Sequence, residues 1–321
     1  MCTALSISGE KNLFGRTFDL DRSYGERVVI TPRNFGFSFL RDIADKDNMG
    51  IVGIGCTRGG FPLYYDGINE KGLGMAALNF PESAKYLPAE SGKLNVASFE
   101  LIPRVLGFCE SLCDALELVE KMNITPDGFS EELPPTPLHW MLSQNGKTAV
   151  VEATEQGIKI YENALGVLTN EPPFPFQRAI ASNFAALSPY PPKPKWNGEI
   201  LKPYSGGTGA IGLPGDFSSS SRFVRAAYLR GTAAECKPDE EISRFFHIMG
   251  SVNIPEGCVI NENGGAMTTR YTVCYDTAAF ECFFTTQDCR RIRRISPTGL
   301  DDGNIAEFPI YRNEDIENIT F

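Results

Sequence analysis

Histidine is scarce in this chain, which has only His139 and His247 in 321 residues. The nine cysteines are irregularly spaced, and Cys109 and Cys113 do not have the spacing of a zinc knuckle. These observations predict that the protein holds no metal ion and needs no metal cofactor. The odd number of cysteines favours reduced, mostly buried thiols over a framework of disulfides.

Positive charge and long apolar runs are also lacking. Asp and Glu number 40 against 30 Lys and Arg, which gives a net charge of −10. Because nucleic-acid binding needs clustered Lys and Arg to neutralise phosphates, this balance predicts no nucleic-acid partner. No run of about 18 apolar residues indicates a membrane span. The N-terminus also lacks the basic and apolar regions of a secretion signal, so we expect a cytoplasmic protein.

The remaining composition is that of a large globular protein. At 42% apolar residues the chain can bury a large core, and no linker divides it, so we expect one domain over residues 1–321. Residues 188–215 are rich in proline and glycine, and we interpret them as a long surface excursion. The tail at 296–321 has weak periodicity, which predicts a surface strap or a segment of uncertain order.

Hydrophobic periodicity predicts blocks of strands separated by blocks of helices. The predicted strands are 3–8, 12–16, 27–31, 35–40, 50–55, 62–66, 73–79, 138–144, 148–153, 157–162, 166–169, 271–277, 280–286 and 290–295. The predicted helices are 97–107, 111–122, 175–186, 219–231 and 239–250, with Ser111 and Asp114 as a capping box. Strands and helices do not alternate, so the pattern indicates an α+β layered protein and argues against a doubly wound parallel sheet.

One glycine pattern resembles a nucleotide-binding motif. Residues 207–212 spell G-x-G-x-x-G, the dinucleotide fingerprint, which is informative only between a strand and the start of a helix. Pro203 precedes the pattern and Pro214 follows it, so no helix is expected to start there. We therefore predict tight turns at this place and no nucleotide cofactor.

The first 22 residues, MCTALSISGEKNLFGRTFDLDR, contain the best candidate for chemistry. Removal of Met1 would leave Cys2 with a thiol and a free α-amino group on one residue, a nucleophile together with its own base. The predicted hairpin would return Arg16 and Asp19 towards Cys2, a cation to favour the thiolate and a carboxylate to hold the ammonium. A cysteine at position 2 is often incidental, so the interpretation depends on the wider sequence.

The wider sequence resembles the choloylglycine hydrolase family of conjugated bile salt hydrolases and penicillin V acylases, within the N-terminal-nucleophile hydrolases. The resemblance covers about residues 1–290 in register. Its motifs are MCT (1–3), FGRTFDLD (14–21), SYGE (23–26), ITPR (30–33), YYDGINEKGLGMAALNFP (64–81), LHW (138–140), LTNEP (168–172) and GLPGDFSSSSRFVRA (212–226). It implies a four-layer αββα sandwich with two stacked antiparallel sheets between helical layers.

The resemblance also implies catalytic roles for residues that have ordinary alternatives. Cys2 is the implied nucleophile, and Arg16, Asp19 and Arg222 set the charge around it. Asn170 matches the family's oxyanion asparagine, although an asparagine in LTNEP could equally end a strand or form a turn. Asn79 matches a polar position where penicillin V acylases often carry an aromatic residue, so it favours bile salts as substrate.

A substrate with a steroid body needs an apolar cleft. Six residues lie in segments that line the pocket in relatives, although each could also be an ordinary core residue. They are Leu20, Tyr24, Phe61, Tyr64, Phe129 and Leu138.

The sequence thus predicts an amidase that cleaves the C–N bond between a bile acid and glycine or taurine. The alternatives are a penicillin V acylase, an N-acyl homoserine lactone acylase, or a catalytically silent protein that binds bile acids or lipids. The resemblance further implies a homotetramer, with residues 127–140 as its assembly loop. It also suggests a cytoplasmic enzyme of a gut bacterium.

Overall fold

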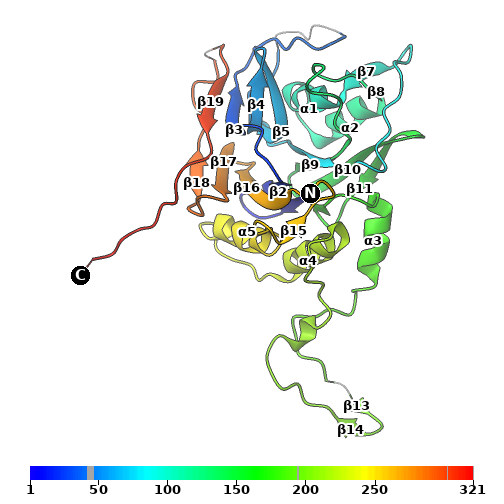
Figure 1. The fold of residues 1–321 in the computed structure, drawn as a ribbon, viewed down its shortest axis with the longest axis vertical. Helices are drawn as coiled ribbons and strands as arrows, with labels where there is room; N and C mark the ends of the chain where they lie inside the picture. The colour runs from blue at the N-terminus through cyan, green and yellow to red at the C-terminus, as the bar shows by residue number, and fades with distance from the viewer. Residues whose placement is uncertain (42–46, 194, 302, 321) are drawn as a thin grey trace.

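The computed structural model describes residues 1–41, 47–193, 195–301 and 303–320. Most of its strands belong to two antiparallel sheets that lie between two layers of helices (Figure 1). This arrangement confirms the predicted α+β class and the four-layer αββα sandwich.

The first sheet contains both strands of the N-terminal hairpin and the long strand that pairs with the second of them. Cys2 lies opposite Phe18, so the predicted hairpin is confirmed. On the other edge of that hairpin Arg16 lies opposite Val273. In sheet order the strands are β12 (Val167–Leu168), β1 (Cys2–Ile7), β2 (Leu13–Leu20), β16 (Ala266–Asp276), β17 (Glu281–Thr286) and β18 (Arg293–Ile295), and β15 (Val259–Ile260) also pairs with β16.

The second sheet has eight strands and lies against the first. In sheet order they are β11 (Gly157–Glu162), β10 (Lys147–Thr154), β9 (Leu138–Gln144), β6 (Gly74–Asn79), β5 (Phe61–Asn69), β4 (Ile51–Arg58), β3 (Arg27–Thr31) and β19 (Ala306–Pro309). Two small pairs lie outside both sheets, the parallel pair β7 (Leu94–Ala97) and β8 (Met122–Thr125) and the hairpin β13 (Lys195–Trp196) and β14 (Glu199–Ile200).

The helices cover the outer faces of the two sheets (Figure 1). On the second sheet lie α1 (Leu101–Phe108), which follows the short 3-10 turn η1 (Ser98–Glu100), and α2 (Leu112–Glu120). On the first sheet lie α3 (Phe174–Ser182), α4 (Ser219–Thr232) and α5 (Glu241–Gly250). The predicted capping box is confirmed: the Ser111 hydroxyl accepts from the Asp114 amide at 3.1 Å, and the Asp114 carboxylate accepts from the Ser111 amide at 3.0 Å.

The apolar residues form two cores, one for each side of the second sheet. The larger core fills the space between the sheets and continues under α3, α4 and α5. The smaller core lies between the second sheet and the layer of α1 and α2. The sheets approach closely where Phe14 packs on Gly74, since a Cβ at Gly74 would lie 2.6 Å from the Phe14 ring. The β2 residues that face the second sheet are therefore tightly packed against it.

Two predicted regions differ in the structure. Residues 35–40 form a loop, because Gly36 has φ of 74°, which interrupts an extended strand, and Phe37 and Phe39 turn into the smaller core. The tail was expected to be a surface strap or a segment of uncertain order; the strand it contains was not predicted, since Ala306–Pro309 joins the second sheet as β19 and Ile310 is fully buried. The sequence did not predict five short strands, because such short segments show no clear periodicity. They are β7, β8, β13, β14 and β15.

Residues 188–215 extend away from the body of the molecule, with β13 and β14 at the tip (Figure 1). This confirms the predicted surface excursion. The G-x-G-x-x-G stretch contains only the 3-10 turn η2 (Thr208–Ala210), and Gly207 has φ of 76°, which fits the expected tight turns. In the described part of the chain, no helix has the length and apolarity needed to cross a membrane.

Candidate active site

Cys2 is the first residue of β1 and is almost completely buried, with 3% of its surface exposed. The ladder between β1 and β2 continues outward to Met1. The Met1 amine donates to the Asp19 carbonyl at 2.7 Å, and the Asp19 amide donates to the Met1 carbonyl at 3.0 Å. The backbone of Cys2 is therefore fixed on both sides while Met1 is attached.

Arg16 supplies the cation nearest the Cys2 sulfur. Its side chain is fully buried, and Nη2 donates to Cys2 Sγ. Nε donates to the Thr17 carbonyl at 3.0 Å, and Nη1 donates to the Ala77 carbonyl of the other sheet. Burial lowers the pKa of Arg16, but attraction to Cys2, Tyr271 and nearby carboxylates outweighs it and the net pKa is raised. Arg16 therefore stays charged beside the Cys2 sulfur.

Arg222 approaches Cys2 from α4 and contacts different atoms. Its Nη1 donates to the Cys2 carbonyl and to Thr3 Oγ1 at 2.7 Å, and Nη2 donates to Asn170 Oδ1 at 2.8 Å. Burial lowers the pKa of Arg222, and the charges of Asp19 and Cys2 oppose that shift. The two predicted arginines thus meet at Cys2, but only Arg16 contacts the sulfur. Arg222 instead holds the Cys2 backbone and Asn170 together.

Asn170 follows β12 and faces the Cys2 nitrogen. Its Oδ1 accepts from Cys2 N at 2.9 Å and from Arg222, and its Nδ2 donates to the Asn79 carbonyl at 2.8 Å. These three bonds fix which way the amide points. Removal of Met1 would turn Cys2 N into an α-amino group at the same place, next to Oδ1. Nδ2 has a second hydrogen that it can donate to another acceptor. The geometry is therefore compatible with Asn170 as an oxyanion donor, and this role stays a prediction.

The loop that carries Asn170 is held by residues that the sequence did not single out. Ser219 Oγ accepts from the Asn170 amide at 2.8 Å, and Gln177 Nε2 donates to the Asn170 carbonyl. His139 Nε2 donates to the Thr169 carbonyl at 2.8 Å. The only signal in the sequence is that His139 and Ser219 lie inside motifs whose other residues were chosen.

The carboxylate of Asp19 is fully buried and bonded to two threonine hydroxyls. Its Oδ1 accepts from Thr269 at 2.7 Å and its Oδ2 from Thr17 at 3.1 Å. The backbone of Asp19, and not this carboxylate, makes the hydrogen bonds to Met1. The charge of Asp19 contributes to the raised pKa of Arg16 and opposes the lowering of the Arg222 pKa by burial. These contacts connect the six predicted catalytic residues, directly or through Asn170, around Met1 and Cys2.

An apolar hollow of about 270 Å³ contains two of the predicted substrate residues. Phe61 and Phe129 line it with ring centroids 6.2 Å apart. The lining is completed by Phe35, Gly36, Ser38, Leu40, Gly59, Gly60, Phe99 and Glu100. A hollow with several aromatic rings and one acidic residue is suited to an apolar ligand.

The other four predicted substrate residues do not line this hollow. Tyr64 is buried in the smaller core, and its hydroxyl shares a hydrogen bond of 2.7 Å with Thr31. Leu20 and Leu138 are half-buried at strand ends, and Tyr24 is 45% exposed. Whether these residues contact a substrate stays a prediction.

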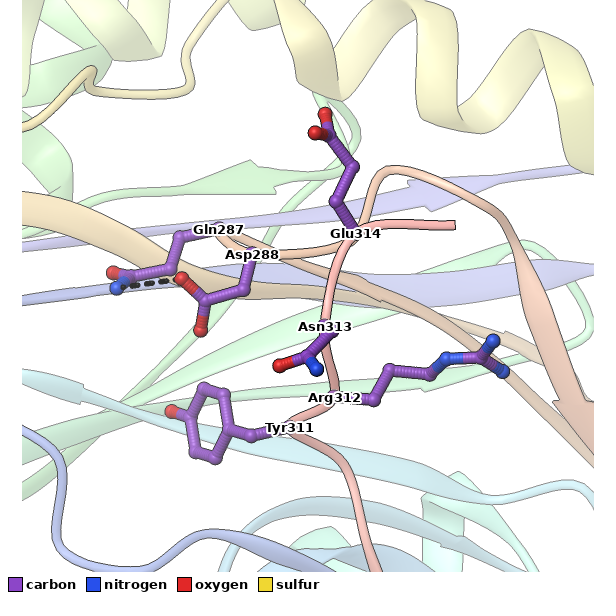
Figure 2. A pocket seen from close by; sticks show the side chains of 6 residues that line it. All are labelled: Gln287, Asp288, Tyr311, Arg312, Asn313 and Glu314. Atoms are coloured by element: carbon purple, nitrogen blue, oxygen red, sulfur yellow. Dashed lines mark hydrogen bonds between the residues drawn. The ribbon is translucent and has the colours of Figure 1, made fainter. Parts of the chain in front are cut away.

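A second hollow, of about 670 Å³, lies at the C-terminal segment. Figure 2 shows that Tyr311 to Glu314 line one side of it, and that Gln287 and Asp288 line the other. The lining is polar and includes none of the predicted site residues. Among the described residues no group of three or more His, Cys, Asp or Glu side chains could hold a metal ion.

Comparison with known proteins gives the context for this geometry. Residues 2–307 match the family model described as "Linear amide C-N hydrolases, choloylglycine hydrolase family". The chain belongs to the choloylglycine hydrolase family. Its resemblance to that family, expected from the motifs, is thus confirmed, and so is its identification as a C–N amide hydrolase.

Relatives in the choloylglycine hydrolase family match the chain over most of its length. A "Bile salt hydrolase/transferase" of Lactiplantibacillus plantarum is 38% identical over 97% of each chain. A "Conjugated bile acid hydrolase" of Lactobacillus gasseri is 37% identical over 87% of this chain and 90% of that protein. The solved C2A mutant of the conjugated bile acid hydrolase from Clostridium perfringens has a TM-score of 0.92, at 30% identity and full coverage of both chains. These matches also confirm the fold.

Proposed function

We propose that this protein is a bile salt hydrolase that cleaves the amide bond of bile acids conjugated to glycine or taurine. The observation that supports it most directly is the position of Cys2. Its sulfur accepts from Arg16, and its nitrogen lies 2.9 Å from Asn170 Oδ1. Both reacting groups of an N-terminal nucleophile are thereby placed before any substrate binds.

The proposed reaction begins after Met1 is removed. The α-amino group of Cys2 accepts the thiol proton, and Sγ attacks the amide carbonyl, so that a C–S bond forms. The free hydrogen of Asn170 Nδ2, together with Asn79, stabilises the oxyanion. The C–N bond then breaks as the ammonium returns its proton to the leaving glycine or taurine. Water finally hydrolyses the thioester, and the bile acid leaves.

The substrate class is supported by the apolar hollow and by Asn79. The rings of Phe61 and Phe129 offer a surface for a steroid body, whose binding is driven mainly by removal of apolar area from water. Asn79 favours a bile salt because it matches a position where penicillin V acylases often carry an aromatic residue. The relatives named above as bile salt or bile acid hydrolases also favour this substrate over a penicillin.

The deciding experiment measures amine release from glycocholate, taurocholate and penicillin V in parallel. Intact mass first shows whether Met1 has been removed, and Cys2→Ala serves as the inactive control. We expect rapid release from at least one bile salt, slow release from penicillin V and none from the Cys2→Ala protein. Faster release from penicillin V would mean that the preferred substrate is a penicillin and not a bile salt. No release from protein that lacks Met1 would favour a binding protein for bile acids or lipids.

We further propose a homotetramer. Several exposed large apolar residues on the projecting segment 188–215 support an assembly surface there, because exposed apolar side chains that gather on one part of a protein mark interaction sites. They are Tyr190, Trp196, Ile200, Tyr204 and Ile211. The earlier candidate, residues 127–140, offers fewer such side chains, and Phe129 within it lines the apolar hollow.

A further inference from the structure

A second carboxylate lies behind Arg16, buried between the two sheets. Asp66 is on β5 and is fully buried. Its Oδ2 lies 3.9 Å from Arg16 Nε and accepts from the Tyr271 hydroxyl at 2.6 Å. Its Oδ1 accepts from the Tyr275 hydroxyl at 2.5 Å. Two groups therefore attract the charge of Arg16, the Cys2 sulfur at Nη2 and the Asp66 carboxylate near Nε.

The hydrogen bonds around Asp66 indicate that it is an anion. The Tyr275 hydroxyl accepts from the Ile54 amide at 3.2 Å, so its own hydrogen points to Asp66. Burial raises the pKa of both Tyr271 and Tyr275, which keeps their hydroxyls protonated as donors. Burial raises the pKa of Asp66 by more than Arg16 and the two hydroxyls lower it, so its net pKa is raised, and it is the hydrogen bonds that indicate an anion. Since every neighbour donates and none accepts, the ionised carboxylate satisfies the site best.

We propose that Asp66 is a positioning residue that shares the charge of Arg16 with Cys2 and limits how strongly the thiolate is stabilised. The proposal rests on the proposed function in one respect, that the Cys2 thiolate is the nucleophile. A thiolate becomes a weaker nucleophile as its conjugate thiol becomes more acidic. A buried guanidinium that is hydrogen-bonded to Cys2 and has no other anion near it would therefore increase the fraction of thiolate. The same guanidinium would make that thiolate a weaker nucleophile. A second buried anion near the same guanidinium, Asp66, balances these two effects.

Several other charged or titratable groups surround this cluster, and any pH-dependent measurement must take them into account. Among the described residues they are Cys2 on β1, Arg16 and Asp19 on β2, Tyr65 and Asp66 on β5, Tyr271 and Tyr275 on β16, Cys282 on β17, Arg222 on α4 and Glu26 before β3. Burial raises the pKa of Cys282, so it stays neutral. Of the carboxylates, Asp66 is the one that faces the Arg16 guanidinium in an ion pair.

The test measures the rate of iodoacetamide alkylation of Cys2 as a function of pH in processed protein without Met1. Alkylation is quantified on the tryptic peptide 2–11, which contains a single cysteine. Asp66→Asn removes the charge and nearly keeps the shape. We expect the midpoint of the rate profile to move down by about one pH unit, because the negative charge of a buried carboxylate near Arg16 is removed. The limiting rate at high pH should fall.

A second variant and a matched control make the outcome decisive. Asp66→Ser also removes the charge and should move the midpoint in the same direction. It replaces Asp66→Asn if that variant proves too unstable to purify. The control is Asp276→Asn, which neutralises another buried carboxylate that pairs with Lys11 at 3.2 Å and is remote from Arg16 in its contacts. Asp276→Asn should leave the midpoint unchanged. An unchanged or raised midpoint in the Asp66 variants would overturn the proposal.

Turnover provides an independent readout. If Asp66 acts through the nucleophile, Asp66→Asn should lower kcat while KM for the best bile salt stays within about twofold, since Asp66 does not line the apolar hollow. A rise in KM with unchanged kcat would contradict the proposal. The alkylation result does not depend on any substrate. Failure of the bile salt assignment would therefore leave this test standing, and failure of this test would leave the substrate assignment standing.

Discussion

Two buried arginines serve different halves of the same residue. Arg16 donates to the sulfur of Cys2, and Arg222 donates to its carbonyl oxygen. A guanidinium can do this because its donors lie in a rigid planar fork, so Arg222 reaches Thr3 and Asn170 with the same group. The reactive side chain and its backbone are thus fixed independently. This separation lets Arg16 affect the thiol while Arg222 determines where the nitrogen lies.

The role of Asn170 can be tested by truncation. Asn170→Ala removes the proposed oxyanion donor and also the acceptor next to the Cys2 nitrogen. We expect kcat for the best bile salt to fall by about 100- to 1000-fold, the effect of losing one oxyanion-hole donor. KM should change far less. Steady-state kinetics check this, with Asn183→Ala at the exposed end of α3 as control; a loss below tenfold would remove Asn170 from the mechanism.

The sequence predicts residues that are linked by local structure better than residues linked across the sandwich. Cys2 and Arg16 could be placed together because one tight hairpin joins them. Asp66 and Tyr271 are 205 positions apart and lie on strands of different sheets. Each looks like an ordinary residue of a strand in the sequence, so nothing local predicts their hydrogen bond. Asn170 and Arg222 were placed by family resemblance and not by periodicity.

At the scale of elements, β2 is the central support of the site. It pairs with β1 on one side and β16 on the other. Gly15 allows the approach of β16, because a Cβ there would lie 2.0 Å from the Val273 carbonyl. Arg16 follows directly, so a shift of β2 would move the guanidinium relative to Cys2. The geometry of the sulfur therefore depends on strand packing as much as on the residues that touch it.

The start of α4, the helix that carries Arg222, should be sensitive to acid. Asp216 accepts from the Ser218 amide at 2.9 Å and the Ser221 hydroxyl at 2.6 Å, and these bonds lower its pKa to about 2. A lowered folded-state pKa stabilises the folded protein above about pH 4, and this contribution is lost as pH falls towards 2. We expect Asp216→Asn to destabilise the protein at pH 7 by up to about 1 kcal/mol, because the site is exposed and screened.

Urea unfolding at several pH values checks this prediction. The difference between Asp216→Asn and the parent protein should shrink as pH falls from 4 to 2. Asp239→Asn, an exposed carboxylate just before α5, is the control, since it makes no comparable hydrogen bond in the described ranges. A difference that stayed constant with pH would mean that the charge of Asp216 does not matter.

Elements were predictable where periodicity and capping agreed. The helix at Leu112–Glu120 follows from its capping box and its apolar face, and the structure confirms both. The strand expected at 35–40 failed because alternation of Phe with small residues also suits a loop whose rings enter a core. In the tail, β19 was missed because its side chains are mostly exposed, so pairing with β3 leaves no alternating pattern in the sequence.

At the scale of the molecule, the sandwich and the projecting segment have separate roles. The sandwich holds all six predicted catalytic residues. Segment 188–215 leaves the layer of α3 and α4 and points away from the two sheets (Figure 1). It contains none of the predicted catalytic residues. The sequence predicted this excursion from its glycines and prolines, but it could not show that its apolar side chains are exposed. That residues 1–321 form a single domain stays a prediction.

The proposed tetramer can be tested on that segment. A triple variant, Trp196→Ser, Ile200→Ser and Tyr204→Ser, removes side chains that are 70%, 68% and 95% exposed. Because they contribute little to the fold of one chain, we expect the same circular dichroism but a smaller assembly by light scattering after gel filtration. The control substitutes Ile316 and Ile319 in the tail by Ser. A triple variant with the parent mass would exclude the segment from the interface.

The pairing of Met1 with Asp19 has a consequence for how the enzyme is made. An aminopeptidase must hold the N-terminus in an extended form, and the folded chain already uses both backbone groups of Met1. A hairpin alone is barely stable in water, so it stays open until β16 docks on β2. That strand is synthesised roughly 250 residues later, which takes about 10–50 s on a ribosome. Excision of Met1, which the proposed mechanism requires, thus has a limited window, and slow excision would yield folded protein without the proposed N-terminal nucleophile.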